Sequence, residues 1–64
     1  MERRPFDTLN DSIDKEVTIQ LKEGQEIKGE LKAFDAHMNL IVDKDKETLL
    51  VRGDNILFIT FNKE

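Results

Sequence analysis

The sequence lacks several residue types that define whole classes of protein. There is no cysteine, which excludes disulfide bonds and thiolate zinc sites. One histidine leaves no metal-ligand cluster, so we expect neither a metal nor another cofactor. No apolar run approaches the roughly 20 residues that span a bilayer, and no hydrophobic segment of a signal peptide follows Met1–Arg4. These absences predict a soluble, intracellular protein, which we place in the cytoplasm.

The chain is also short and acidic. Its 64 residues predict one domain, residues 1–64, and a chain of this size buries only about 60% of its unfolded surface. Without disulfides or a metal, oligomerisation is the expected extra source of stability. The net charge of -4 argues against a generally basic nucleic-acid-binding surface. It leaves open a local site that binds through stacking and base-edge contacts.

Hydrophobic periodicity predicts a mainly β fold that begins with one short helix. Pro5 suits the first helical turn, and Phe6, Leu9 and Ile13 form one apolar stripe at helical spacing. The period then changes to two, as in Val17, Ile19 and Leu21. The predicted helix spans residues 5–12, and the predicted strands span residues 15–22, 26–35, 39–43, 48–52 and 55–61.

The predicted second strand carries a glycine on its apolar face. Ile27, Gly29, Leu31 and Ala33 alternate with charged residues there, and an interior glycine marks a bend or a close backbone approach. The last three strands are instead apolar on both faces, as in Ile56–Ile59. A second apolar face needs a second burial site, which the helix and a neighbouring copy would provide. Pairing between the open edges of copies would give a closed ring or a filament.

Two polar clusters interrupt these apolar strands. The first is Phe34–Leu40, which includes Asp35, His37 and Asn39, and the second is Arg52–Asn55. If they meet in space, they supply the ring, cation and amide that grip a flat polar ring such as a nucleobase. Each also has a structural reading, because Asp35 and Asn39 suit a tight turn and Met38 suits the core. Residues 43–47 read as a solvated hairpin end.

The two clusters resemble the two sequence motifs of the Sm and Sm-like (LSm) family, and the chain is most similar to archaeal members. The first motif is matched by Asp35-x-His37-Met38-Asn39, with Gly29 in the strand before it. The second is matched by Leu50–Ile56, which contains Arg52 and Gly53. The resemblance implies a strongly bent five-stranded antiparallel sheet, a small SH3-like open barrel capped by the helix. It also implies a ring of seven copies, or of six, joined through the fourth and fifth strands.

The resemblance further implies binding of uridine-rich single-stranded RNA at the inner rim of the pore. His37 and Arg52 would stack on the two faces of a uracil, and Asn39 would read its edge. Gly53 and Asp54 belong to the same motif. Choosing uracil over cytosine needs a fixed Asn39 amide, and we expect either Asp35 or a backbone amide near Asp54 to hold it. Arg4 and Phe34 are candidates for a second RNA site, although Phe34 equally suits packing of the helix onto the sheet.

Three classes of function remain to be compared. The leading hypothesis is a homo-oligomeric ring without enzymatic activity, which acts as a scaffold or chaperone for uridine-rich RNA in RNA processing. The alternative is a small barrel that oligomerises or binds another protein without specific RNA binding. An enzyme is disfavoured because the one histidine has no second general base or cysteine nucleophile to work with. The connection over residues 43–48 is shorter than in many relatives, which puts contacts by projecting strands in doubt.

Overall fold

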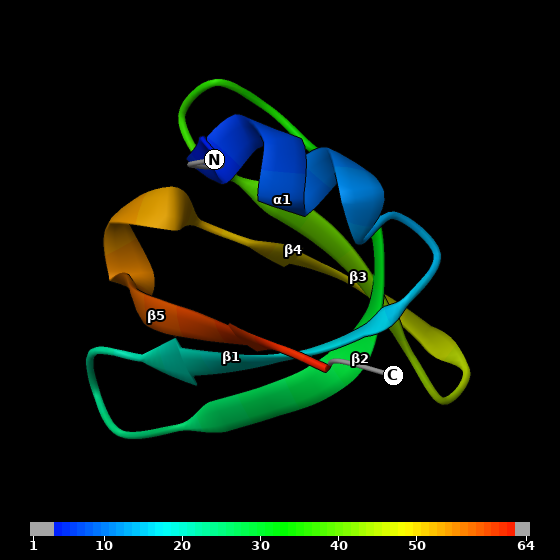
Figure 1. Cartoon of the computed structure of the whole chain (residues 1–64). Helices are drawn as coiled ribbons and strands as arrows, with labels where there is room; N and C mark the ends of the chain where they lie inside the picture. The colour runs from blue at the N-terminus through cyan, green and yellow to red at the C-terminus, as the bar shows by residue number, and fades with distance from the viewer. Residues whose placement is uncertain (1–3, 63–64) are drawn as a thin grey trace.

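The computed structural model describes residues 4–62, as one helix and five strands (Figure 1). Each observed end lies within one residue of the range predicted from the sequence. A short 3-10 turn, η1, separates the last two strands. The elements in chain order are α1 (Pro5–Asp11), β1 (Glu16–Leu21), β2 (Glu26–Phe34), β3 (Leu40–Lys44), β4 (Glu47–Val51), η1 (Gly53–Asn55) and β5 (Ile56–Phe61).

The fold class predicted from the sequence is confirmed: a helix precedes one antiparallel sheet with the order β4-β3-β2-β1-β5. The sheet bends around a common interior, and α1 lies over one open end of it (Figure 1). Among residues 4–62 no helix is long and apolar enough to cross a membrane. The expectation about a signal peptide rests mainly on residues 1–3, which lie outside the described residues.

The bend depends on a close approach between β2 and β3. Gly29 pairs with Val17 of β1, and a Cβ added to it would lie 2.6 Å from the carbonyl oxygen of Asp43 and 2.6 Å from Cγ1 of Val42. Only a residue without a side chain allows this spacing. The expectation of a close backbone approach at Gly29 is therefore confirmed.

Two apolar residues do not lie where the periodicity placed them. Ala33 was expected on the buried face of β2 but is exposed, because the β2–β3 register shifts between Leu31 and Ala33. Phe6 was expected on the buried stripe of α1 but is 59% exposed. Since α1 has only two turns and covers the rim, its middle residue Leu9 alone is buried, and Phe6 extends to contact Phe34.

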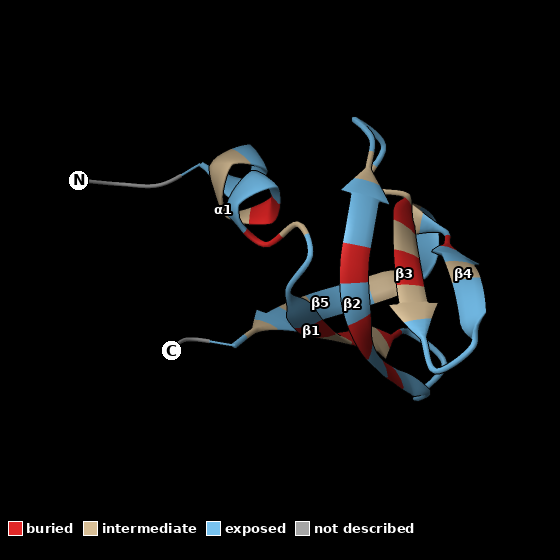
Figure 2. Cartoon of the chain, turned by 90° about the vertical axis from the view of Figure 1, so that its right-hand side faces the viewer, coloured by how far each residue is buried: buried red, intermediate tan, exposed pale blue. Residues whose placement is uncertain are grey.

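The core is small and lies inside the bent sheet. Buried and exposed positions alternate along β1 and β2, as the period of two predicts, and Figure 2 shows this alternation on β2. The buried apolar residues are Leu9, Val17, Ile19, Leu21, Ile27, Leu31, Leu40, Val42 and Val51. A core of nine side chains matches the expectation that so short a chain buries little apolar surface.

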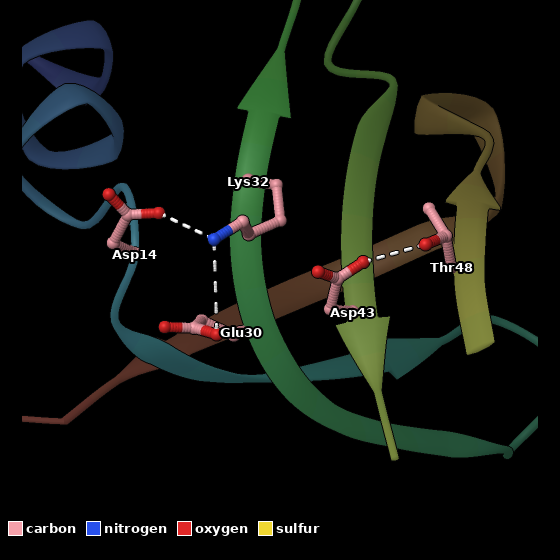
Figure 3. Close-up of polar contacts among 5 residues, drawn as sticks. All are labelled: Asp14, Glu30, Lys32, Asp43 and Thr48. Atoms are coloured by element: carbon pink, nitrogen blue, oxygen red, sulfur yellow. Dashed lines mark hydrogen bonds and ion pairs between the residues drawn. The ribbon is translucent and has the colours of Figure 1, made fainter. Parts of the chain in front are cut away.

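Polar contacts fasten the outer face of the sheet (Figure 3). The Nζ atom of Lys32 donates to Oδ1 of Asp14 at 2.8 Å and lies 4.0 Å from Oε1 of Glu30. The hydrogen bond to Asp14 raises the pKa of Lys32. Thr48 donates its hydroxyl to Oδ1 of Asp43 at 2.8 Å, which joins β3 to β4. These contacts link the connection after α1 to β2 and close the β3–β4 hairpin.

The two ends of the sheet are open in the single chain. β4 and β5 are the terminal strands of the sheet order, so within residues 4–62 each has one unpaired edge. Both strands also expose large apolar side chains: Leu50 is 64%, Leu57 60% and Phe58 56% exposed. This agrees with the prediction that the later strands need a second burial site, which α1 does not supply.

Candidate nucleic-acid interface

The loop between β2 and β3 is organised around one carboxylate. Oδ1 of Asp35 accepts the backbone N–H of His37 at 2.9 Å and that of Asn39 at 3.0 Å. The backbone N–H of Met38 donates to the carbonyl of Asp35 at 3.0 Å. The bonds from Asn39, backbone first and side chain second, hold the pKa of Asp35 below its usual range. The carboxylate therefore stays ionised at neutral pH and fixes the position of residues 37–39.

The Asn39 side chain is held at both ends of its amide. Its Nδ2 donates to Oδ2 of Asp35 at 3.2 Å, while its Oδ1 accepts the backbone N–H of Gly53 at 2.8 Å. An amide nitrogen has two hydrogens and a carbonyl oxygen has two lone pairs. One donor and one acceptor position therefore remain for a ligand, in a fixed orientation. Both devices expected from the sequence, the Asp35 carboxylate and a backbone amide beside Asp54, are present together.

The second polar cluster touches the first at Gly53. Arg52 is extended, and the chain then turns through η1, where the N–H of Asn55 donates to the carbonyl of Arg52 at 3.0 Å. A Cβ added to Gly53 would collide with the carbonyl oxygen of His37 and would lie 2.9 Å from the carbonyl carbon of Met38. Glycine is thus the residue that lets the two loops meet.

This contact creates one groove with polar and flat groups on its walls. Its volume is about 580 Å³, and it is lined by His37, Met38, Asn39, Arg52, Gly53 and Asp54. The side chains of His37 and Arg52 are exposed, and the Arg52 guanidinium lies 3.9 Å from the Asp54 carboxylate. An exposed ion pair of this length is weak, so the guanidinium is available to a ligand. Five of the six predicted site residues line the groove, and Asp35 lies behind Asn39.

Met38 is the groove residue that the sequence did not indicate. It was read as a core residue, and its half-buried side chain does pack against the core. It also lines the groove and has a φ of 66°. This left-handed conformation is uncommon for a residue with a side chain. A period-based reading places only the side chain, so it gives no signal for the backbone geometry of Met38.

The predicted second site divides between two different contacts. Nε of Arg4 lies 3.5 Å from Oδ2 of Asp7, within the first turn of α1. Phe34 is half-buried, and its ring meets that of Phe6 edge to face, with 5.0 Å between the centroids. Phe34 therefore does help to hold α1 on the sheet, as its alternative reading proposed. The exposed ring of Phe6 is an addition to this face that the sequence analysis assigned to the core.

Residues 7–61 match the family model described as the LSM domain. The chain belongs to the LSM family. The match includes both polar clusters and all five strands, so the resemblance given by Asp35-x-His37-Met38-Asn39 and Leu50–Ile56 is confirmed.

Archaeal relatives support the same assignment of this LSM chain. An snRNP Sm-like protein of Methanosarcina barkeri is 37% identical over 71 residues, which covers 94% of this chain and 99% of the relative. The SmAP1 heptamer of Pyrobaculum aerophilum superposes with a TM-score of 0.87 at 34% identity, over 100% of both chains. The Pyrococcus abyssii Sm protein, solved in complex with a uridine heptamer, has a TM-score of 0.83 at 34% identity. It matches 94% of this chain and 100% of its own.

The chain is compact compared with these relatives. The alignment with the Methanosarcina protein has 71 positions, so that protein carries residues for which this 64-residue LSM chain has no counterpart. In this chain β3 ends at Lys44 and β4 begins at Glu47, which leaves only Asp45 and Lys46 between them. Asp45 has a φ of 56°, which such a tight turn requires. The sheet therefore ends here in a short hairpin.

Proposed function

We propose that this LSM chain forms a homo-oligomeric ring that binds uridine-rich single-stranded RNA at the inner rim of its pore. Seven copies are the expected number, and six is the alternative. The ring would act in the cytoplasm as a scaffold or chaperone in RNA processing, without enzymatic activity. The observation that carries the proposal is the fixed Asn39 amide between two groups that can stack on a base, His37 and Arg52.

The remaining donor and acceptor of Asn39 match the edge of uracil. Uracil offers the O4 acceptor beside the N3–H donor. The second hydrogen on Nδ2 would donate to O4, and the second lone pair on Oδ1 would accept from N3–H. Cytosine reverses this pattern, so it would face the same amide with a donor against a donor and an acceptor against an acceptor. Exchanging two hydrogen bonds for two mismatches costs on the order of 1–3 kcal/mol per base, or about 5- to 150-fold.

Stacking would supply most of the affinity, and Asn39 the selectivity. A base stacked on an aromatic ring gains roughly 1–3 kcal/mol whatever its identity. His37 and Arg52 offer one flat group from each polar cluster, and the two clusters are joined at Gly53. This arrangement needs no positive surface, which explains how a chain with a net charge of -4 would bind RNA.

The open strands support assembly into a ring. β4 and β5 each offer an unpaired edge with exposed leucine or phenylalanine, and they lie at opposite ends of the sheet order. Edge pairing of this kind is head-to-tail, and it closes when the rotation between copies divides a full turn. The SmAP1 protein of Pyrobaculum aerophilum is a heptamer, and the Pyrococcus abyssii protein is bound to a uridine heptamer. Both are relatives over nearly the whole chain.

A second base site near Arg4 and Phe34 belongs to the same proposal. The exposed Arg4 side chain and the Phe6–Phe34 ring pair would hold a base on the face of the ring that carries α1. Replacing Arg4 with alanine should weaken binding of a long oligo-U more than binding of a heptamer, because only a long strand reaches both sites. Equal effects on the two lengths would remove this site from the proposal.

Fluorescence anisotropy with labelled oligo-U and oligo-C tests the main site. We expect His37→Ala, Asn39→Ala and Arg52→Ala each to weaken oligo-U binding at least tenfold while the assembled mass is unchanged. Lys28→Ala is the matched control, since it removes an exposed positive charge from β2 outside the groove. Unchanged affinity in all three groove variants would place the RNA elsewhere, or leave the protein-interaction module as the better reading.

Asp35→Ala tests the orientation of the amide separately. Without the carboxylate, Asn39 keeps its bond from Gly53 but loses the partner of Nδ2. The preference for oligo-U over oligo-C should then fall at least fivefold. Full retention of that preference would show that Gly53 alone holds the amide.

A further inference from the structure

Met38 and Gly53 lie where two grooves meet. Both residues line the base groove described above, and both also line an apolar groove of about 400 Å³ between α1 and β5. The other residues that line this apolar groove are Pro5, Thr8, Leu9, Ile56, Leu57, Phe58, Ile59 and Phe61. A change in what fills one groove therefore bears directly on the wall of the other.

The backbone of Met38 sets the positions of the two residues that would hold a base. Met38 has a φ of 66°, and His37 and Asn39 precede and follow it directly. The loop is held by the bonds to Asp35, and Gly53 packs against the carbonyl group of Met38. The Met38 side chain is half-buried and reaches the core from one side. Its other side borders the apolar groove.

A second copy of this chain is the occupant that the apolar groove fits. The groove runs along β5, whose outer edge is unpaired and whose Leu57 and Phe58 are more than half exposed. The complementary edge, β4 with its exposed Leu50, lies at the other end of the same sheet. A copy that pairs its β4 with this β5 brings apolar side chains to the groove. Head-to-tail pairing repeats the same contact at every subunit.

We propose that Met38 is a positioning residue that links assembly to base binding. The neighbouring copy packs against Met38 in the apolar groove, and this contact holds His37 and Asn39 in the geometry that a uracil needs. The proposal rests on the ring and the uridine site proposed above. Because linkage is reciprocal, a base bound in the groove strengthens the contact between copies by the same factor.

Uridine monophosphate is the probe that isolates this effect. A single nucleotide occupies one groove, so the gain that a long RNA obtains from several linked sites does not enter. Leu57→Asp places a charge on the exposed face of β5 and should dissociate the ring without touching the base groove; Leu50→Asp breaks the same contact from the β4 side. Circular dichroism shows which of these dissociated copies remain folded. We expect the Kd for uridine monophosphate to be at least fivefold weaker in the folded, dissociated copies than in the wild-type ring.

Met38→Ala tests the residue itself and needs no dissociation of the ring. Shortening the side chain should leave the assembled mass unchanged and weaken uridine monophosphate at least threefold, whereas Met38→Leu, which keeps the volume, should restore most of the affinity. A Met38→Ala ring that binds the nucleotide as tightly as wild type overturns the proposal. Equal Kd values in ring and dissociated copies do so as well, while oligo-U binding by the ring leaves the proposed function standing. A wild-type ring that binds neither oligo-U nor the nucleotide refutes the proposed function itself.

Discussion

Gly53 is the point of contact between the two polar loops, and replacing it with alanine perturbs that contact alone. The added Cβ would lie 2.9 Å from the carbonyl carbon of Met38, whereas ordinary contacts begin at 3.4 Å. The loops must therefore separate by about 0.5 Å or more. A shift of that size along the Gly53 N–H to Asn39 Oδ1 bond stretches it from 2.8 Å to roughly 3.3 Å, beyond the usual range.

The energetic cost follows from two terms. Overpacking of one methyl group costs about 1–3 kcal/mol, and weakening one hydrogen bond costs about 0.5–1.5 kcal/mol. If half of this total falls on the base groove, oligo-U affinity declines by about 1–2 kcal/mol, which is roughly 5- to 30-fold. The remainder appears as a lower free energy of unfolding.

Fluorescence anisotropy with oligo-U, together with urea unfolding, measures both terms. Gly24→Ala is the matched control: a Cβ there meets nothing within 4 Å, and its cost comes only from a φ of 109°. That control should lose about 1 kcal/mol of stability and keep its RNA affinity. If Gly53→Ala binds oligo-U as tightly as Gly24→Ala does, the contact at Gly53 does not shape the site.

Three further outcomes follow from the same structure. Gly29→Ala should lower the free energy of unfolding in urea by about 1–3 kcal/mol, since its Cβ would lie 2.6 Å from the Asp43 carbonyl oxygen; an unchanged midpoint would refute the close approach. Leu9→Ala should cost about 2–5 kcal/mol in the same assay, because Leu9 is 2% exposed; a loss below 1 kcal/mol would mean that α1 contributes little to the core. The pKa of Asp35 is lowered in the folded protein, so its contribution is complete above its ordinary pKa and is lost as pH falls through the lowered value. Preference for oligo-U over oligo-C, followed by anisotropy, should be constant from pH 8 to 5 and decline only below about pH 4; a decline near pH 6 would exclude Asp35 as its cause.

Local periodicity predicted the element order because the short elements of this chain have clean patterns. Val17, Ile19 and Leu21 alternate with polar residues, and all three are buried. The two misplaced residues show where this reasoning stops. Ala33 follows a register shift, and Phe6 lies at the end of a two-turn helix that covers a rim. Both positions depend on how elements pack against each other, which a period along the chain does not record.

The candidate site was predictable in composition but not in geometry. The residue types in Asp35–Asn39 and Arg52–Asp54 indicate a turn and a base-binding surface. The contact of Gly53 with the His37–Met38 backbone is a long-range one, and so is its bond to Asn39. The sequence offered two candidate partners for the Asn39 amide, and only coordinates show that both are used. The dual position of Met38 has no sequence signal at all.

The exposed strands and the base groove together suggest how an acidic chain handles RNA. Leu50, Leu57 and Phe58 lie on the open strand edges, while His37 and Arg52 lie in the groove between the loops. A ring would cover the first group and repeat the second around a pore. Most acidic side chains would then remain on the outer surfaces, away from the RNA phosphates.

Native mass spectrometry of the wild-type chain with heptauridine tests this account most directly. The account predicts a single assembly of seven copies, or of six, that carries one heptauridine and retains it in excess heptacytidine. A monomer, or an assembled ring that exchanges heptauridine for heptacytidine without preference, would contradict it.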